Sequence, residues 1–232
     1  MKKLLKILII LLLIGLSIAL LFVGKGYKMY KEAIENVPLE EKVQEIQSKE
    51  SYTEYSELPQ MYINAVISVE DKRFLKHGGI DIIAIGRAVV NDLRTMSYAE
   101  GGSTITQQLA KNMYFTQDKI MERKVAEVFM AWEIEKNYSK EDIFELYVNS
   151  IYFGDGYYTV KEACKGYFNK DISEMTDYEC IMLAGIPNAP SVYAPTVNPE
   201  LAKQRQRQVM DKMIENGYLT EEEADEILKA AE

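Results

Sequence analysis

Five short segments hold the polar residues that could carry out chemistry, and the first contains paired carboxylates. Glu70 and Asp71 stand where an apolar helical pattern ends, shortly before His77 and a turn at Gly78-Gly79. A carboxylate at such a junction can face a cleft and act as a general base. Taken alone, the same cluster is more often a solvated helix end whose charges pair with their neighbours.

The second segment, Gly101 to Asn112, is typical of a glycine turn that leads into a helix. We expect Ser103 to cap that helix, whose first backbone N–H groups could receive a phosphate. Gln107, Gln108 and Lys111 would then project polar groups about one helical turn apart. The segment is not a Walker loop, because the Gly-Lys-Ser/Thr ending is absent.

The third segment holds two basic residues, Arg123 and Lys124, followed by Glu127. Arg123 and Glu127 are four residues apart and therefore share one helix face. The usual role of such a pair is a surface ion pair. The alternative is that the two cations meet a phosphate-bearing ligand while Glu127 orients them.

The last two segments are aromatic and proline-rich. Tyr147, Asn149 and Tyr152 gather before Gly154, which suits sugar recognition and core packing equally well. The fifth segment, residues 184–193, ends an apolar helical run in a proline-fixed loop, for which a purely structural role is sufficient.

Helical periodicity dominates the chain that must position these segments, and strand-like alternation is scarce, so we predict an all-α fold. Three stretches repeat apolar residues at spacings of three and four, and their simplest role is packing in a core. These residues are Tyr62, Ala65, Val66 and Val69; Ile82, Ile85, Val89 and Leu93; and Val125, Val128, Phe129 and Trp132.

Start and stop signals divide the chain into roughly eight short to medium helices. Ser139, Thr176 and Thr220 each stand three residues before an acidic residue, which is the form of a capping box. Glycine or proline breaks fall at residues 77–79, 100–102, 154–156 and 187–199.

Composition excludes several classes of site. The formal net charge of -9 argues against broad nucleic-acid binding. One histidine, His77, leaves no multi-histidine metal site. Cys164 and Cys180 form no CxxC pair, so we expect free, partly buried thiols and no zinc or redox motif.

The beginning of the chain predicts a membrane anchor. After residues 1–3, residues 4–23 form an apolar run long enough to cross a bilayer as a helix. A cleaved signal peptide is the alternative, but its apolar core would usually be shorter, and no small-x-small cleavage pattern follows. Lysines flank the run on both sides, so charge alone leaves its orientation open. We expect residues 24–50 to form a polar stalk and residues 51–232 to form the domain.

Together and in this order, the five segments resemble the peptidoglycan glycosyltransferases, the family of monofunctional transglycosylases and of the N-terminal domains of bifunctional penicillin-binding proteins. Residues 70–79 match E-D-x-x-F-x-x-H-x-G, residues 101–112 match G-G-S-T-I-T-Q-Q-x-x-K-N, and residues 123–127 match R-K-x-x-E. Residues 147–154 and 184–193 resemble the last two motifs. Ile80 stands where the family commonly has phenylalanine, and Val148 where leucine is frequent, but both are apolar exchanges.

The resemblance implies a lysozyme-like bilobal helical domain, with a head and a membrane-proximal jaw, preceded by one transmembrane helix. It implies an enzyme that polymerises lipid II into β-1,4-linked glycan strands for the cell wall, with inversion and release of polyprenyl diphosphate. It also implies a bacterial cell-membrane protein with a single span, whose catalytic domain lies on the extracytoplasmic side. There is no room for a transpeptidase domain, so the monofunctional type is expected unless the chain is a fragment.

The same resemblance assigns roles to residues. Glu70 matches the catalytic base, and Glu127, also placed among the catalytic residues, holds a basic group in position. His77 is expected to be a structural hydrogen-bonding residue. The residues expected to bind substrate are Asp71, Phe74, Ser103, Thr104, Gln107, Gln108, Lys111, Asn112, Arg123, Lys124, Tyr147, Asn149 and Tyr152.

The expected partners are lipid II, the growing lipid-linked glycan, the cytoplasmic membrane and proteins of cell-wall synthesis or division, with no nucleic acid. No cofactor is obligatory, and a divalent cation, Mg²⁺ or Mn²⁺, would share the charge of the diphosphate. Two rivals remain: a membrane-bound lytic enzyme that cuts glycan, and a silent scaffold that binds the lipid-linked precursor. The basic segment argues against the lytic enzyme, which has no diphosphate to hold.

Overall fold

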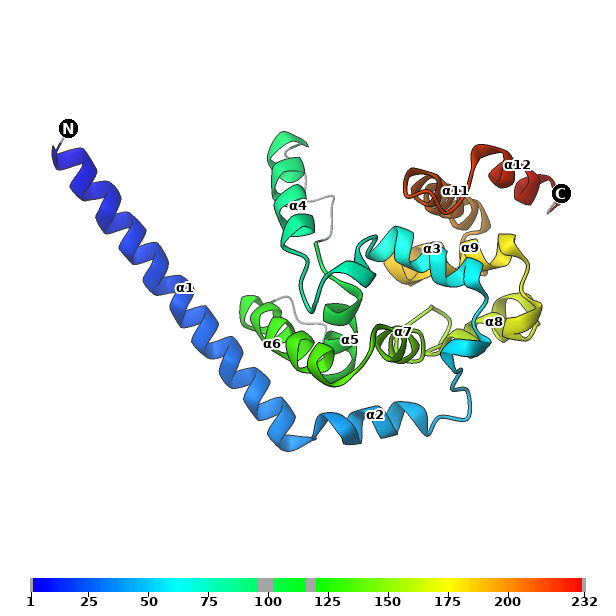
Figure 1. Cartoon of the computed structure of the whole chain (residues 1–232), viewed down its shortest axis with the longest axis horizontal. Helices are drawn as coiled ribbons and strands as arrows, with labels where there is room; N and C mark the ends of the chain where they lie inside the picture. The colour runs from blue at the N-terminus through cyan, green and yellow to red at the C-terminus, as the bar shows by residue number, and fades with distance from the viewer. Residues whose placement is uncertain (1, 96–101, 116–119, 231–232) are drawn as a thin grey trace.

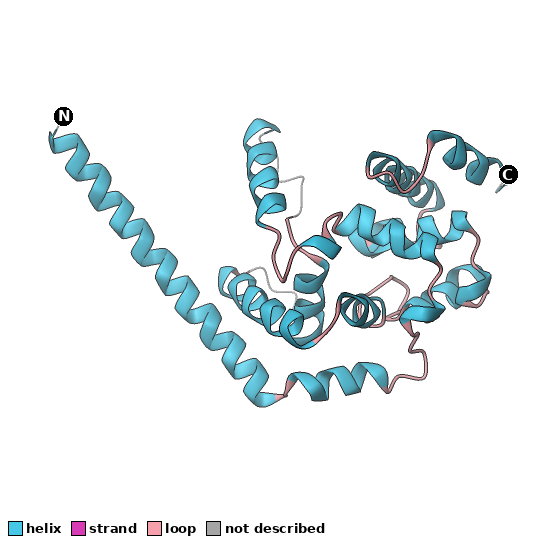
Figure 2. Cartoon of the chain, in the orientation of Figure 1, coloured by secondary structure: helices cyan, strands magenta, loops and turns pink. Residues whose placement is uncertain are grey.

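The computed structural model describes residues 2–95, 102–115 and 120–230, and these residues are organised as helices and connecting loops (Figure 2). The described residues contain no strand, only an isolated bridge between Gly154 and Tyr157. The all-α prediction is therefore confirmed. The α-helices are α1 (Lys2–Asn36), α2 (Leu39–Gln47), α3 (Gln60–Glu70), α4 (Ile82–Thr95), α5 (Ile105–Tyr114), α6 (Met121–Asn137), α7 (Lys140–Val148), α8 (Val160–Phe168), α9 (Asp177–Gly185), α10 (Pro190–Tyr193), α11 (Pro199–Glu215) and α12 (Glu221–Ala230).

The described residues hold more helices than expected, and one of them lies where a break was predicted, in the proline-rich stretch at residues 187–199. A 3₁₀ turn at Ile186–Asn188 is followed directly by α10. The three predicted capping boxes at Ser139, Thr176 and Thr220 are confirmed by reciprocal hydrogen bonds to the third residue of each helix.

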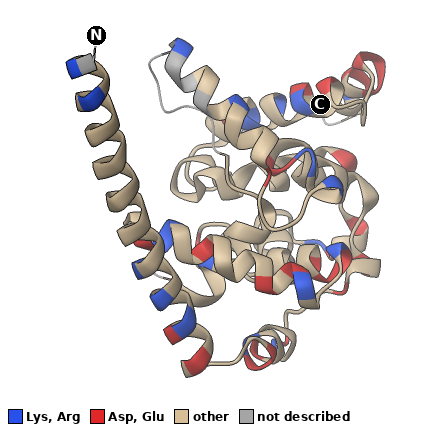
Figure 3. Ribbon diagram, turned by 60° about the vertical axis from the view of Figure 1, so that its left-hand side comes forward, with Lys and Arg blue, Asp and Glu red and all other residues tan. Residues whose placement is uncertain are grey.

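Helix α1 is one unbroken rod that leaves the body of the molecule along most of its length (Figure 1). Residues 3–36 include a window of mean hydropathy 3.1 and are long enough to cross a membrane. Charged residues are sparse along the apolar part and reappear where the rod meets the domain (Figure 3). At about 1.5 Å per residue, α1 exceeds the roughly 30 Å of a bilayer core, so its last turns lie outside that thickness.

The last turns of α1 dock on α6. Gly26 permits the close approach, because a Cβ atom added there would lie 2.5 Å from the Cβ of Val125. Next to it, Tyr27 packs its ring edge-on against Phe129 with centroids 5.1 Å apart, and Lys25 forms an ion pair of 3.4 Å with Glu122. Domain and anchor are therefore joined by direct packing.

The segment expected to be a stalk is helical. Its first part continues α1 as far as Asn36, and α2 then buries Leu39, Val43 and Ile46 against the core. The predicted domain boundaries are not tested by these contacts and stay a prediction.

The core lies between two groups of helices. Helices α3, α9 and α11 pack against one another, and α5 packs against α6 and α7. Tyr62 of α3 and Tyr147 of α7 are among its largest fully buried side chains. Cys164 and Cys180 are free, as expected, but both are fully buried and not partly so.

Of the three apolar stripes, only that of α3 packs mainly in the core. The prediction was wrong for α4, where Ile82 is 74% and Ile85 39% exposed, because this helix projects away from the body (Figure 1). The side chains of Val89 and Leu93 lie outside the described residues.

The stripe of α6 also differs from the prediction. Its half-buried Phe129 faces α1, and Trp132 is 48% exposed. The buried face of α6 is instead formed by Ala126, Met130 and Ile134, because the helix lies between α1 on one side and α5 on the other.

Candidate active site

A cleft of about 510 Å³ opens where α3 ends. The helix stops after Glu70 because Asp71 leaves helical geometry, with φ −157° and ψ 76°. Several elements line the cleft: the end of α3 with Glu70, α4 with Ala84 and Arg87, the approach to α5 with Ser103 and Thr104, the turn at Asn188, and α11 with Arg205. The first two of the five sequence segments therefore meet at one cavity.

Glu70 is held by a short chain of hydrogen bonds. Its Oε2 accepts a hydrogen bond of 2.8 Å from Nε2 of Gln108, and Oε1 of Gln108 in turn accepts one of 3.4 Å from the Tyr147 hydroxyl. Tyr147 is fully buried, so the hydroxyl that holds the Gln108 amide is fixed by the core. The amide orientation follows from this network.

The environment of Glu70 favours a base. Burial raises the pKa of its carboxyl group, while the Gln108 hydrogen bond and the charges of Arg205 and Lys111 act in the opposite direction. A carboxylate whose pKa is raised toward the working pH accepts a proton more readily than an ordinary one.

A cluster of cations forms around Glu127, which is 1% exposed. Its two oxygens form ion pairs of 3.0 Å with Arg123 and 2.9 Å with Lys124. Lys124 also donates a hydrogen bond of 2.6 Å to the hydroxyl of Ser103, which joins the third sequence segment to the second. We call Lys111, Arg123 and Lys124 the basic cluster.

Lys111 completes the basic cluster from α5. Burial lowers the pKa of its ammonium group, although the charge of Glu127 acts in the opposite direction. The charges of Arg123 and Lys124 lower that pKa further. The cations outnumber the one buried carboxylate, that of Glu127, so the group keeps a net positive charge that suits an anion.

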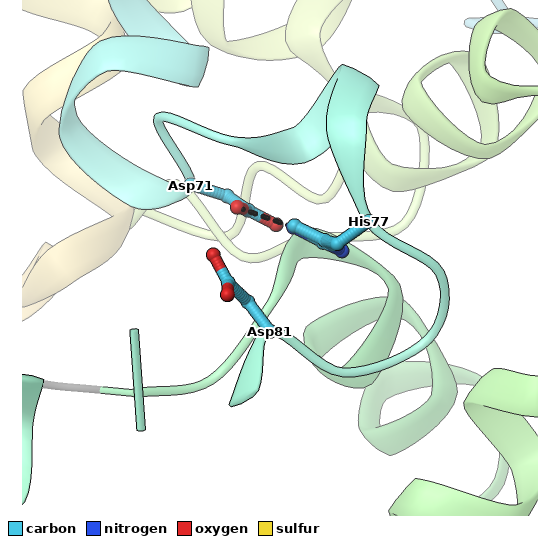
Figure 4. Close-up of side chains that lie close together, drawn as sticks. All are labelled: Asp71, His77 and Asp81. Atoms are coloured by element: carbon cyan, nitrogen blue, oxygen red, sulfur yellow. Dashed lines mark hydrogen bonds and ion pairs between the residues drawn. The ribbon is translucent and has the colours of Figure 1, made fainter. Parts of the chain in front are cut away.

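Asp71, His77 and Asp81 form a second cluster (Figure 4), and its two carboxylates also line the cleft. Their ligand atoms lie within 4.8 Å of one another, so the group has the spacing of a metal site. The carboxylates, however, are already used within the protein. Asp71 accepts hydrogen bonds from His77 at 2.7 Å and from the N–H of Ile105 at 3.1 Å.

Asp81 is equally committed. One oxygen forms a 2.9 Å bond with Arg73 and the other accepts the N–H groups of Ile83 and Ala84, at the start of α4. The expectation that His77 has a structural hydrogen-bonding role agrees with these contacts. The cluster fastens the loop after α3 to the beginnings of α4 and α5.

The N-cap of α5 corrects a prediction. The capping residue is Thr104 and not Ser103: its hydroxyl accepts the N–H of Gln107, and the Gln107 side chain accepts the N–H of Thr104. The reason is the capping-box spacing, since Gln107 stands three residues after Thr104. Ser103 is thereby left to contact Lys124.

Several residues expected to bind substrate are placed in structural positions. Phe74 is 1% exposed and packs against Phe144, and Gln107 is buried in the capping box. Asn149 is fully buried, where its side chain exchanges two hydrogen bonds with the backbone of Thr53. Asp71 belongs to the second cluster.

Two further residues keep polar or aromatic groups available. Asn112 is half-buried one residue after Lys111. Tyr152 is 42% exposed, and the centroids of its ring and the Tyr158 ring are 4.9 Å apart. None of the contacts described for Tyr152 is with the basic cluster.

Sequence reasoning missed Arg205, which lines the cleft from α11. Its Nε donates to the carbonyl of Gly185 at 3.3 Å, and its charge acts on Glu70. The only sequence signal was a basic residue on a highly charged helix, which is usually a solvated face.

Residues 38–214 match the protein family described as Transglycosylase. Penicillin-binding protein 1A of Neisseria lactamica is 43% identical over 182 residues, which are 78% of this chain and 23% of that protein. Penicillin-binding protein 1F of Bacillus subtilis is 45% identical over 169 residues, 73% of this chain and 24% of that protein.

A crystal structure of penicillin-binding protein 1A from Haemophilus influenzae aligns with 54% of this chain and 15% of that chain, with 29% identity and a TM-score of 0.38. The chain thus spans about a quarter of the length of the curated relatives named above. Because the family match covers most of its residues, the chain belongs to the transglycosylase family.

Proposed function

We propose that this chain is a peptidoglycan glycosyltransferase, which polymerises lipid II into β-1,4-linked glycan strands and releases polyprenyl diphosphate. The observation that carries the proposal is the pairing of Glu70, a carboxylate with a raised pKa at the cleft, with the neighbouring basic cluster. The names of the relatives and the family match support the same reaction class.

In the reaction, the 4-hydroxyl of the acceptor sugar attacks C1 of the donor sugar. Glu70 takes the hydroxyl proton as the new C–O bond forms, and the bond from C1 to the diphosphate breaks with inversion. The electron pair leaves with the diphosphate, whose growing charge is stabilised by Lys111, Arg123 and Lys124. Glu127 positions two of these cations through its ion pairs.

Arg205 reaches the cleft from α11 and lines the same cavity as Glu70. Its charge acts to lower the pKa of Glu70, against the effect of burial, and so favours the ionised carboxylate. We assign it to the acceptor side, where an ionised Glu70 is needed.

A divalent cation at the diphosphate would be held by substrate oxygens and not by a protein cage. Within the part of the chain that the structure describes, the one grouping with metal-ligand spacing is committed to internal hydrogen bonds, and Glu127 is committed to cations. No step of the mechanism depends on the metal.

The anchor places the enzyme beside its substrates. We propose that residues 4–23 span the cytoplasmic membrane with the N-terminus inside, so that the domain lies on the extracytoplasmic side where lipid II presents its sugars. Tethering confines enzyme and substrate to one surface and raises their effective concentration. Recruitment by proteins of cell-wall synthesis or division stays a prediction.

The direct test incubates the purified full chain with lipid-linked disaccharide. Lengthening glycan together with polyprenyl diphosphate release is the expected result. Shortening of preformed glycan would instead assign the lytic reaction, and binding without any product would assign a scaffold.

A further inference from the structure

A small apolar slot lies between the anchor helix and the helices of the basic cluster. Its volume is about 260 Å³, and it is lined by Met29 and Ala33 of α1, Tyr114 and Phe115 at the end of α5, and Ile120 and Arg123 at the start of α6. Apart from Arg123, no residue assigned above to the reaction lines it.

We propose that this slot binds the first isoprene units of the donor's polyprenyl chain, those next to the diphosphate. The inference rests on the proposed function and deepens it, because it gives the lipid part of the substrate a site of its own on the protein.

Charge and polarity in the slot match that occupant. Arg123 belongs both to the slot and to the basic cluster, so a diphosphate held by the cluster would leave its attached chain at the slot entrance. The polar tip of Tyr114 is directed elsewhere, since its hydroxyl donates a 3.1 Å hydrogen bond to the carbonyl of Val37. Among the described residues, the walls therefore offer an apolar surface beside one cationic side chain, that of Arg123.

The position of the slot relative to the anchor also fits. Met29 and Ala33 follow the end of the apolar run at Val23 by six and ten residues, or about 9 and 15 Å along a helix. A lipid whose diphosphate reaches Arg123 must leave the bilayer over a comparable distance. Without a protein surface to cover it, that part of the chain would be exposed to water.

The proposal is tested by binding in the full-length protein, held in detergent, with geranyl diphosphate and methyl diphosphate as probes. Both carry the same anion, and only the first carries two isoprene units. We expect the wild type to bind geranyl diphosphate at least about tenfold more tightly than methyl diphosphate, because several CH₂ groups become buried.

Filling the slot should remove this preference. Ala33→Phe is expected to bring the affinity ratio of the two probes close to one, while Glu35→Phe keeps it, since Glu35 is exposed on the same helix and does not line the slot. Met29→Gln makes the lining polar without adding bulk and should lower the ratio as well, which covers the case that Ala33→Phe folds poorly. An unchanged ratio in both slot variants, or a ratio near one in the wild type, overturns the proposal.

A geranyl diphosphate with a diazirine on its outer isoprene unit gives a second readout. We expect crosslinks in peptides containing Met29 or Tyr114, displaced by unlabelled geranyl diphosphate. Crosslinks confined to residues 4–23 would overturn the slot as the site. Because neither assay needs glycan synthesis, loss of chain-dependent binding sinks the slot alone, whereas absence of polymerisation sinks the proposed function and leaves the binding result in place.

Discussion

Glu70 and Asp71 are neighbours in sequence and both carry carboxylates, yet the structure uses them differently. Both oxygens of Asp71 are occupied by His77 and the start of α5, whereas the only hydrogen bond described for Glu70 is the one that Gln108 donates to Oε2 at the cleft. If Glu70 is the base, as proposed, one motif contains both a residue that builds the site and a residue that reacts in it. Their contacts, and not their chemical types, separate the two groups.

The largest effect is expected for a substitution of Glu70, the residue proposed to react. Glu70→Gln should lower the polymerisation rate by about 10² to 10⁴, the range typical of a lost general base, because an amide cannot accept the acceptor's proton. Glycan synthesis from lipid-linked disaccharide measures the rate, and thermal unfolding followed by circular dichroism serves as the folding control. Full activity in this variant would remove Glu70 from the role of base.

Lys111→Ala should come next, with kcat/KM for the donor reduced by about 10- to 100-fold, the value of one charge-assisted contact to a diphosphate. Binding of a substrate-mimicking inhibitor should weaken in parallel. Lys111→Arg is the matched variant and should restore part of the loss. If Lys111→Ala binds the inhibitor as tightly as the wild type, the basic cluster does not hold the diphosphate.

Asp71 has a structural role in this comparison. Asp71→Ala should destabilise the fold by about 3 kcal/mol, because it leaves the buried His77 side chain and the N–H of Ile105 without their partner. Thermal or denaturant unfolding measures the loss, with the exposed Asp211→Ala as the control. If stability is unchanged and only catalysis falls, Asp71 belongs with the reacting residues and the comparison breaks down.

The smallest effect concerns the pH profile. The proposed base, Glu70, must be ionised to accept a proton, so kcat/KM should rise with pH through its pKa, which lies above the usual carboxyl value of 4.5. The Gln108 hydrogen bond lowers that pKa. Tyr147→Phe loosens Gln108 and should therefore move the acidic limb of the profile to higher pH.

The matched control for this shift is Tyr178→Phe, since Tyr178 lies on α9, outside the cleft lining. A limb that stays in place in Tyr147→Phe would show that Tyr147 only packs in the core. If Tyr147→Phe keeps part of the polymerisation rate while the acidic limb of its pH profile is displaced, Tyr147 is a positioning residue.

Much of this organisation could be predicted from sequence because it depends on local signals. Helix class, capping boxes and the spacing of Arg123 to Glu127 all follow from residues within one or two turns of each other. Arg205 could not be predicted, because its place beside Glu70 depends on the packing of α11 against α3. The same long-range packing decides that Asn149 holds the backbone of Thr53 and that Ile82 is exposed.

The close contact at Gly26 ties the candidate membrane span to the rest of the molecule. The helix has no break between Val23 and the docked turns of α1, so the span and the domain are joined rigidly. If residues 4–23 span the bilayer as proposed, their tilt follows its thickness, and the tilt passes to the domain without a hinge. Bilayer thickness then becomes a variable of catalysis, since it sets the angle at which the cleft meets substrates that are themselves embedded in lipid.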